Sequence, residues 1–171
     1  GTLYVRMPGD IDPNTVKVEA AQQLNLIDAK AMRHVEVSGF VFRFTNYLWN
    51  YEWYPFQDAD VRPACVRLLG GGEDIRVAHC VFEHVSKAVR IEAQSPADTL
   101  DRIAVTDNDI RFTDHSALYI QDYTGGWREN DPSKMSRLVR VDILRNRLYE
   151  ITQRFARMEH GHAMQVQHPE D

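Results

Sequence analysis

The pentapeptide Cys65-Val66-Arg67-Leu68-Leu69 has three later equivalents in the chain: Ala88-Val89-Arg90-Ile91-Glu92, Ala117-Leu118-Tyr119-Ile120-Gln121 and Ala163-Met164-Gln165-Val166-Gln167. Each copy opens with a small residue and then alternates inward-type aliphatic side chains with mostly polar ones. This alternation has the two-residue period of a β-strand. The copies begin 23, 29 and 46 residues apart, so one strand recurs along the chain with loops of different length between its copies.

A second pattern follows the first three copies. It consists of two short apolar segments separated by a turn: Ile75-Arg76-Val77 with Cys80-Val81-Phe82, Ile103-Ala104-Val105 with Asn108-Asp109-Ile110, and Val141-Asp142-Ile143 with Asn146-Arg147-Leu148; Val35-Glu36-Val37 with Phe40-Val41-Phe42 is an earlier copy. Each repeat therefore predicts three short strands. Valine and isoleucine together number 25 against 11 leucines, which also favours strands over helices.

The strands lack the dipeptides that close tight hairpins, because the sequence contains no Asn-Gly and no Asp-Gly. A β-sandwich would need such turns at regular intervals. Strands without hairpin partners pair instead with their equivalents one repeat away, at about 4.8 Å per layer. The sequence thus predicts an all-β fold, a parallel β-helix of four to five coils with three parallel sheets, in which Val66, Val89, Leu118 and Met164 share one inward column.

The predicted organisation is a single β-helix segment over residues 1–171, with a lead-in at 1–23 and stacked coils at 24–171. Inserted loops are expected at 46–63, 121–137 and 152–162. The end coils of a β-helix expose apolar core and unpaired strand edges. We therefore expect the segment to belong to a longer protein or to associate with itself at the coil ends.

Asn108 and Asn146 occupy equivalent positions at the tight bend between the second and third strands of their repeats. Asparagine tolerates the left-handed backbone conformation, and its amide can bond to the next layer. The sequence is equally compatible with two independent turn asparagines.

The composition of the chain restricts the classes of partner that the protein can bind. The net charge is −5 and the basic residues form no long run, so the electrostatic footprint of a nucleic-acid binder is missing. The chain has no run of 18 apolar residues that would predict a membrane span. Cys65 and Cys80 lie within apolar runs and are expected to be buried rather than to form a disulfide framework.

The chain resembles the right-handed parallel β-helix superfamily, the pectate-lyase-like fold of many glycoside hydrolases and polysaccharide lyases. The resemblance is carried by Gly1-Thr2-Leu3-Tyr4-Val5-Arg6-Met7-Pro8-Gly9-Asp10, Asp12-Pro13-Asn14, Val18-Glu19-Ala20 and His34-Val35-Glu36-Val37-Ser38-Gly39-Phe40-Val41-Phe42-Arg43. It implies a right-handed coil, a carbohydrate-active protein and an extracellular or periplasmic location. No catalytic motif of a particular enzyme family matches, because the repeat pattern encodes stacking rather than chemistry.

The outward face of the first strand stack is the expected floor of a substrate groove, since the inserted loops flank it. Polar contacts repeated at each layer would suit an extended sugar polymer, and arginine forks suit carboxylated sugars. The expected substrate-binding residues are Arg67, Arg90, Tyr119, Gln121, Trp127, Gln165 and His168. The alternative is an ordinary solvated sheet face.

Glu92 and Asp122 fall in adjacent layers near one edge of this face and could form the carboxylate pair of a glycosidase. His162, within His160-Gly161-His162, is the candidate base. Surface salt bridges and turn histidines are the alternative assignments. No metal site is predicted, since Asp107-Asn108-Asp109 lacks the rest of a calcium loop, and no other cofactor is indicated.

The inserted segment at 47–56 contains six of the 17 aromatic residues and offers either sugar platforms or a plug over the coil. The sequence leaves three classes of function open. The first is an enzyme that cleaves a polysaccharide, the second is a non-catalytic carbohydrate-binding or cell-surface β-helix, and the third is an oligomerising fibre element. Convergent carboxylates would favour the enzyme.

Overall fold

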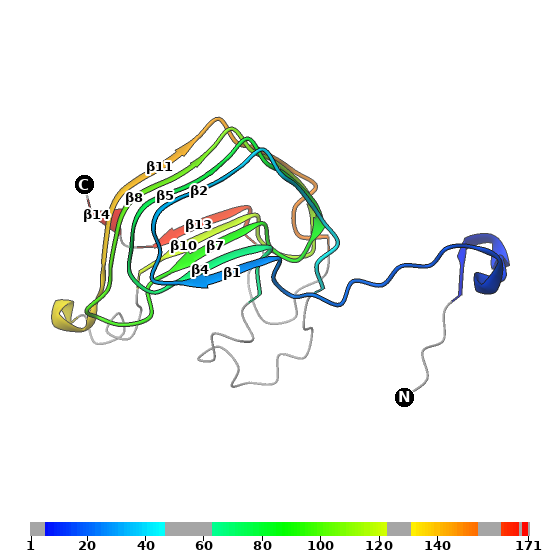
Figure 1. The fold of residues 1–171 in the computed structure, drawn as a ribbon, viewed down its shortest axis with the longest axis horizontal. Coiled ribbons are helices and arrows are strands. Elements are labelled where there is room, and N and C mark those ends of the chain that lie inside the picture. The colour runs from blue at the N-terminus through cyan, green and yellow to red at the C-terminus, as the bar shows by residue number, and fades with distance from the viewer. Residues whose placement is uncertain (1–5, 47–62, 123–130, 154–161, 168, 171) are drawn as a thin grey trace.

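The computed structural model describes residues 6–46, 63–122, 131–153, 162–167, 169 and 170. Three parallel sheets dominate this part of the chain (Figure 1). The first sheet contains β1 (Ile27–Lys30), β4 (Val66–Leu69), β7 (Val89–Glu92), β10 (Leu118–Gln121) and β13 (Met164–Gln167), in that spatial order. The predicted column of Val66, Val89, Leu118 and Met164 is confirmed, since these residues are successive strand partners.

The second sheet contains β2 (Arg33–Ser38), β5 (Gly72–Ala78), β8 (Thr99–Thr106), β11 (Arg137–Leu144) and β14 (Pro169–Glu170). The third contains β3 (Val41–Arg43), β6 (Val81–Val85), β9 (Asp109–Thr113) and β12 (Arg147–Tyr149). Each strand pairs in parallel with its equivalents in the neighbouring coils. The fold is therefore a parallel β-helix with four full coils and the beginning of a fifth, as the sequence predicted.

The short 3-10 turns η1 (Pro8–Asp10) and η2 (Pro13–Thr15) belong to the lead-in, which extends away from the coils before β1 (Figure 1). A third turn, η5 (Pro132–Lys134), precedes β11. Gln121 and Arg137 are strand residues, so the loop between β10 and β11 is slightly shorter than the expected insertion. No helix among the described residues is long and apolar enough to cross a membrane.

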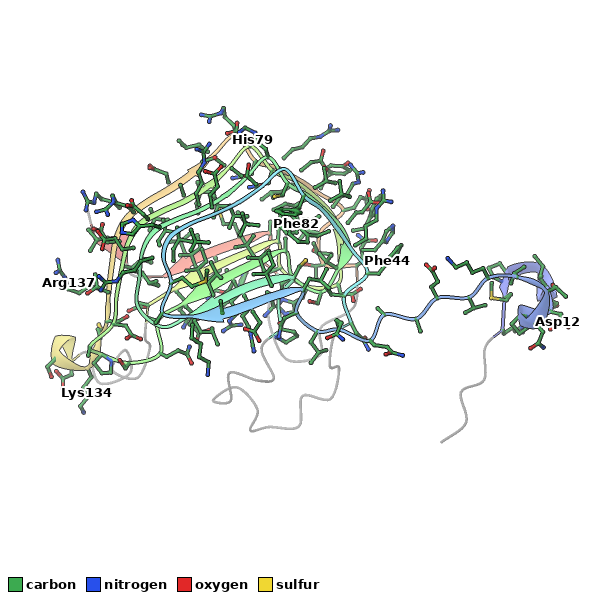
Figure 2. All side chains as sticks on the ribbon, in the orientation of Figure 1. Asp12, Phe44, His79, Phe82, Lys134 and Arg137 are labelled. Carbon is green, nitrogen blue, oxygen red and sulfur yellow. The ribbon has the colours of Figure 1, made fainter. Side chains whose placement is uncertain are left out.

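The interior of the coils is filled by columns of aliphatic and aromatic side chains. In the first sheet these are Val66, Leu68, Val89, Ile91, Leu118 and Ile120, all within the core cluster. In the third sheet Phe42 stacks on Phe82 with ring centroids 5.0 Å apart, close to the layer spacing. Phe82 points into the interior of the coils (Figure 2). Cys65 and Cys80 are buried and unbonded to each other, and burial raises the pKa of Cys65 to about 12.

Left-handed residues recur at equivalent places in successive coils. His34, Asp74, Arg102 and Arg140 all have φ between 51° and 54° and stand in one column of the second sheet. Their side chains pair across the layers: His34 Nδ1 lies 2.8 Å from Asp74 Oδ2, and Arg102 Nε donates to Asp74 Oδ1 at 2.5 Å. The Arg102 hydrogen bond is the main reason why the pKa of Asp74 falls to about 2.

Asn108 and Asn146 form a hydrogen-bonded ladder across the layers. This excludes the alternative that they are two independent turn residues. Asn108 Oδ1 accepts from the Cys80 amide at 2.9 Å, and its Nδ2 donates to Val77 O at 3.0 Å and to Asn146 Oδ1 at 2.9 Å. The left-handed residue of this bend is the one before each asparagine, Asp107 or Arg145. The expectation that the asparagines themselves would be left-handed is therefore wrong, because their amides are needed in an orientation that reaches the neighbouring coils.

Candidate functional site

The outward face of the first sheet is buried over β4, β7 and the end of β10, whereas Asp28 and Lys30 of β1 are exposed. Leu69 points outward, outside the core cluster, yet it is only 2% exposed. Six polar residues on and beside this part of the face are equally inaccessible, and we call Arg67, Lys87, Arg90, Glu92, Gln121 and Asp122 the buried polar layer. The face is therefore not the solvated sheet surface that the sequence left open. It is an enclosed layer of ionisable side chains on the outside of a β-helix.

Both arginines of this layer have a carboxylate partner. Arg67 donates from Nε to Asp28 Oδ1 at 2.9 Å and from Nη2 to Asp28 Oδ2 at 2.5 Å, across one layer. Arg90 donates from Nε to Glu92 Oε2 at 2.6 Å within its own strand, and its Nη2 contacts the same oxygen. Such charge-assisted pairs are fixed in orientation. They bring donors and acceptors together with little net charge.

Tyr119 provides an aromatic surface in the same column. The Arg90 guanidinium carbon lies 4.4 Å from the ring centroid and Lys87 Nζ lies 5.2 Å from it. Arg67, Arg90, Tyr119 and Gln165 are successive strand partners. The structure thus brings together four of the expected substrate-binding residues, of which Gln165 lies in the last coil and is partly exposed.

Glu92, Gln121 and Asp122 lie together at the C-terminal end of the strands. Glu92 and Gln121 are direct partners in register, and Asp122 follows immediately, only 1% exposed. The two candidate catalytic carboxylates are therefore one layer apart, as the sequence suggested. Gln121 is 4% exposed and its Oε1 is buried without a hydrogen-bond partner.

His162 does not join these carboxylates. It precedes β13 and lies at the opposite end of the strands, at the position equivalent to Ser116 in the neighbouring coil. Its neighbour in that region is His115, whose Nδ1 lies 2.9 Å from Ser116 Oγ. Burial lowers the pKa of His115 to about 3, with smaller contributions from Lys87, His162 and Arg90. Lys87 was not among the expected site residues, although it stands at the same repeat position as Ser116 and His162, and the sequence indicated His115 only as a turn histidine at a strand end.

The depressed pKa of His115 predicts a pH-dependent stability. His115 is neutral in the folded protein while the unfolded chain takes up a proton near pH 6.5. Its contribution is therefore complete above about pH 6.5 and is lost as the pH falls towards 3. Denaturant unfolding between pH 7 and pH 4 should show a steeper loss of stability for the native chain than for His115→Asn. Equal slopes for the native chain and His115→Asn would contradict the assignment.

Several expected site residues lie outside the described part of the chain. These are Trp127, His168, His160 and the aromatic-rich segment 47–56. Among the described residues, no group of three or more His, Cys, Asp and Glu side chains has the arrangement of a metal site.

The ion pairs on the outer surfaces of the other two sheets are exposed, unlike those of the buried polar layer. The Arg140 side chain that pairs with Asp101 is 58% exposed, and the Arg145 side chain that pairs with Asp107 is 67% exposed. In contrast, the Arg90 side chain is 2% exposed and its partner Glu92 is 8% exposed. Exposed pairs of this kind contribute little to stability, whereas burying ionised groups is costly. The concentration of buried charge on one face distinguishes it as the candidate site.

Comparisons with known proteins found no match to this chain among family models, curated proteins or solved structures.

Proposed function

We propose that the protein is carbohydrate-active, and that it binds a saccharide on the outer face of the first sheet and cleaves it between Glu92 and Asp122. The observation that carries the proposal is the buried polar layer. Apolar side chains of similar size would cover a sheet face at lower cost, since replacing a buried ion pair in this way is often neutral or stabilising. Ionisable groups gathered and buried in one place are typical of functional sites.

The chemistry of the layer suits a sugar. Arg–carboxylate pairs offer donors and acceptors at fixed positions, which matches neighbouring hydroxyl groups, and the Tyr119 ring adds an aromatic surface. Because Asp28 and Glu92 already occupy the arginine forks, the layer favours a neutral sugar over the carboxylated sugar that free arginines would suggest. The resemblance to pectate-lyase-like β-helices supports the same class of substrate and, with it, an extracellular or periplasmic location.

The proposed cleavage uses the two carboxyl groups at the end of the strands. Glu92 is held in a fixed orientation by the hydrogen bond from Arg90 Nε to its Oε2, and in the proposal it acts as base or nucleophile. Asp122, buried at the adjacent position, acts as the acid that protonates the leaving oxygen. A non-catalytic carbohydrate-binding β-helix is the alternative, because the same paired groups would hold a sugar without cleaving it.

The test is a screen of the protein, within its full-length chain, on neutral and acidic polysaccharides and oligosaccharides, with binding, new reducing ends and unsaturated products all measured. We expect binding to neutral sugars and new reducing ends. Glu92→Gln and Asp122→Asn should each lower the rate by about 10²–10⁴-fold while binding persists. Glu36→Gln and Asp142→Asn are the matched controls, because these residues lie on the outer face of the second sheet and have no ion pair among the described residues. They should change neither the rate of cleavage nor the binding.

The outcomes separate the possibilities. Binding without any product supports the non-catalytic alternative, and unsaturated products would indicate a lyase rather than a hydrolase. A full panel with neither binding nor cleavage would contradict the proposed function.

A further inference from the structure

Gln121 is the one residue of the buried polar layer whose side chain has no partner in the described structure. It lies on the outward face of β10, directly beside Glu92 in the neighbouring coil and next to Asp122. Its Oε1 is shielded from solvent and accepts no hydrogen bond. Arg67, Arg90 and Glu92, in contrast, are all held by charge-assisted hydrogen bonds.

An unsatisfied amide in this position is unfavourable for the free protein. The group loses its hydrogen bonds to water on burial and gains none in exchange. A leucine or methionine would fill the same space without this loss, as Leu69 does in the same column one coil away from Glu92. Buried polar side chains are normally satisfied, so an exception calls for a group that completes it.

We infer that Gln121 is a specificity-determining residue, whose Oε1 accepts a hydrogen bond from a hydroxyl of the bound saccharide. The inference rests on the proposed function and assigns a ligand atom to one side chain. Around this position the layer presents two acceptors, Glu92 and Gln121, and one donor, Arg90. A pair of neighbouring hydroxyl groups complements this set, with one hydroxyl donating to Gln121 and the other lying near the Arg90–Glu92 pair. The ligand class is therefore an uncharged sugar with a vicinal diol.

Gln121→Met tests the inference with two separate readouts. The first is the denaturant unfolding of the free protein, and the second is the affinity for the saccharide identified in the screen. We expect the unfolding midpoint of the variant to equal or exceed that of the native chain, because an unpaired amide has been removed. The affinity should fall about tenfold or more, the loss that one buried hydrogen bond entails. The control is Gln94→Met, because Gln94 is exposed and its amide donates to its neighbour, Ala93 O; it should change neither readout.

Two results would overturn the inference. A clear loss of stability in Gln121→Met would show that the amide is satisfied in the free protein, and an unchanged affinity would show that the ligand does not use it. Gln121→Leu repeats both measurements with a second apolar side chain if the methionine variant misfolds. Failure of the native chain to bind any saccharide would contradict the proposed function instead, and the stability readout would still report on the amide.

Discussion

Replacement of Arg90 by methionine is expected to lower the free energy of unfolding by about 3–5 kcal/mol, the usual effect of removing one partner from a buried ion pair. Methionine fills much of the arginine volume, so the loss comes from charge rather than from a cavity. The Glu92 carboxylate would remain buried without the guanidinium that contacts its Oε2 at 2.6 Å. Denaturant unfolding at neutral pH measures the effect.

A double variant isolates the charge. Arg90→Met combined with Glu92→Leu removes both ionised groups and should recover most of the lost stability, since a buried pair exchanged for apolar side chains is often neutral. Arg140→Met provides the exposed control and should leave the free energy of unfolding nearly unchanged, because that guanidinium lies mostly in solvent. A double variant as unstable as Arg90→Met would show that the pair is not the source of the loss.

Asn108→Ala is expected to lower the free energy of unfolding by about 3 kcal/mol, because it leaves several buried groups without a partner at about 1–3 kcal/mol for each such group. The Cys80 amide and the Val77 carbonyl both lose their bond to this side chain. Asn108→Asp should be at least as harmful, since a carboxylate cannot donate to Val77 O or to Asn146 Oδ1. Thermal or denaturant unfolding of the three chains gives the comparison.

Asn146→Ala serves as the graded control for the ladder. Asn146 Nδ2 donates to Val105 O at 2.7 Å, and Asn146 Oδ1 accepts from the backbone N–H of Asn108 at 3.0 Å. Asn146 lies one coil nearer the C-terminal end of the β-helix than Asn108 and is only partly buried. We expect a smaller loss than for Asn108→Ala. An equal or larger loss would mean that burial does not set the strength of this ladder.

The fold could be predicted because the inward side chains repeat in register. Val66, Val89 and Leu118 recur at the same place in a short pattern, and no hairpin dipeptide competes with parallel pairing. The bend was predicted less well. His79, Asp107 and Arg145 adopt the left-handed conformation before Cys80, Asn108 and Asn146. Histidine and aspartate are enriched in this conformation but arginine is not, so residue type alone does not predict all three positions.

The outward column of the candidate site could be predicted from the sequence, but the burial of that column could not. Equivalent positions in the repeat indicated that Arg67, Arg90 and Tyr119 share an outward column, which the register confirms. Their burial was not predicted, because alternation assigns a side chain to a face without indicating what covers that face. Leu69 was the available sign, as an aliphatic residue at an outward position otherwise occupied by Glu92 and Gln121.

The layered pairing also determines how such a molecule can change in length. Val66 pairs with Val89, so the unit from Val66 to Ala88 occupies one complete turn of the solenoid without an inserted loop. Gain or loss of that unit as a whole would leave every remaining strand opposite a homologous neighbour, whereas the addition of one residue within a strand would move aliphatic groups to the outside. Such a protein can therefore evolve by duplication of entire turns, whereas insertions of single residues are tolerated only in the loops between strands.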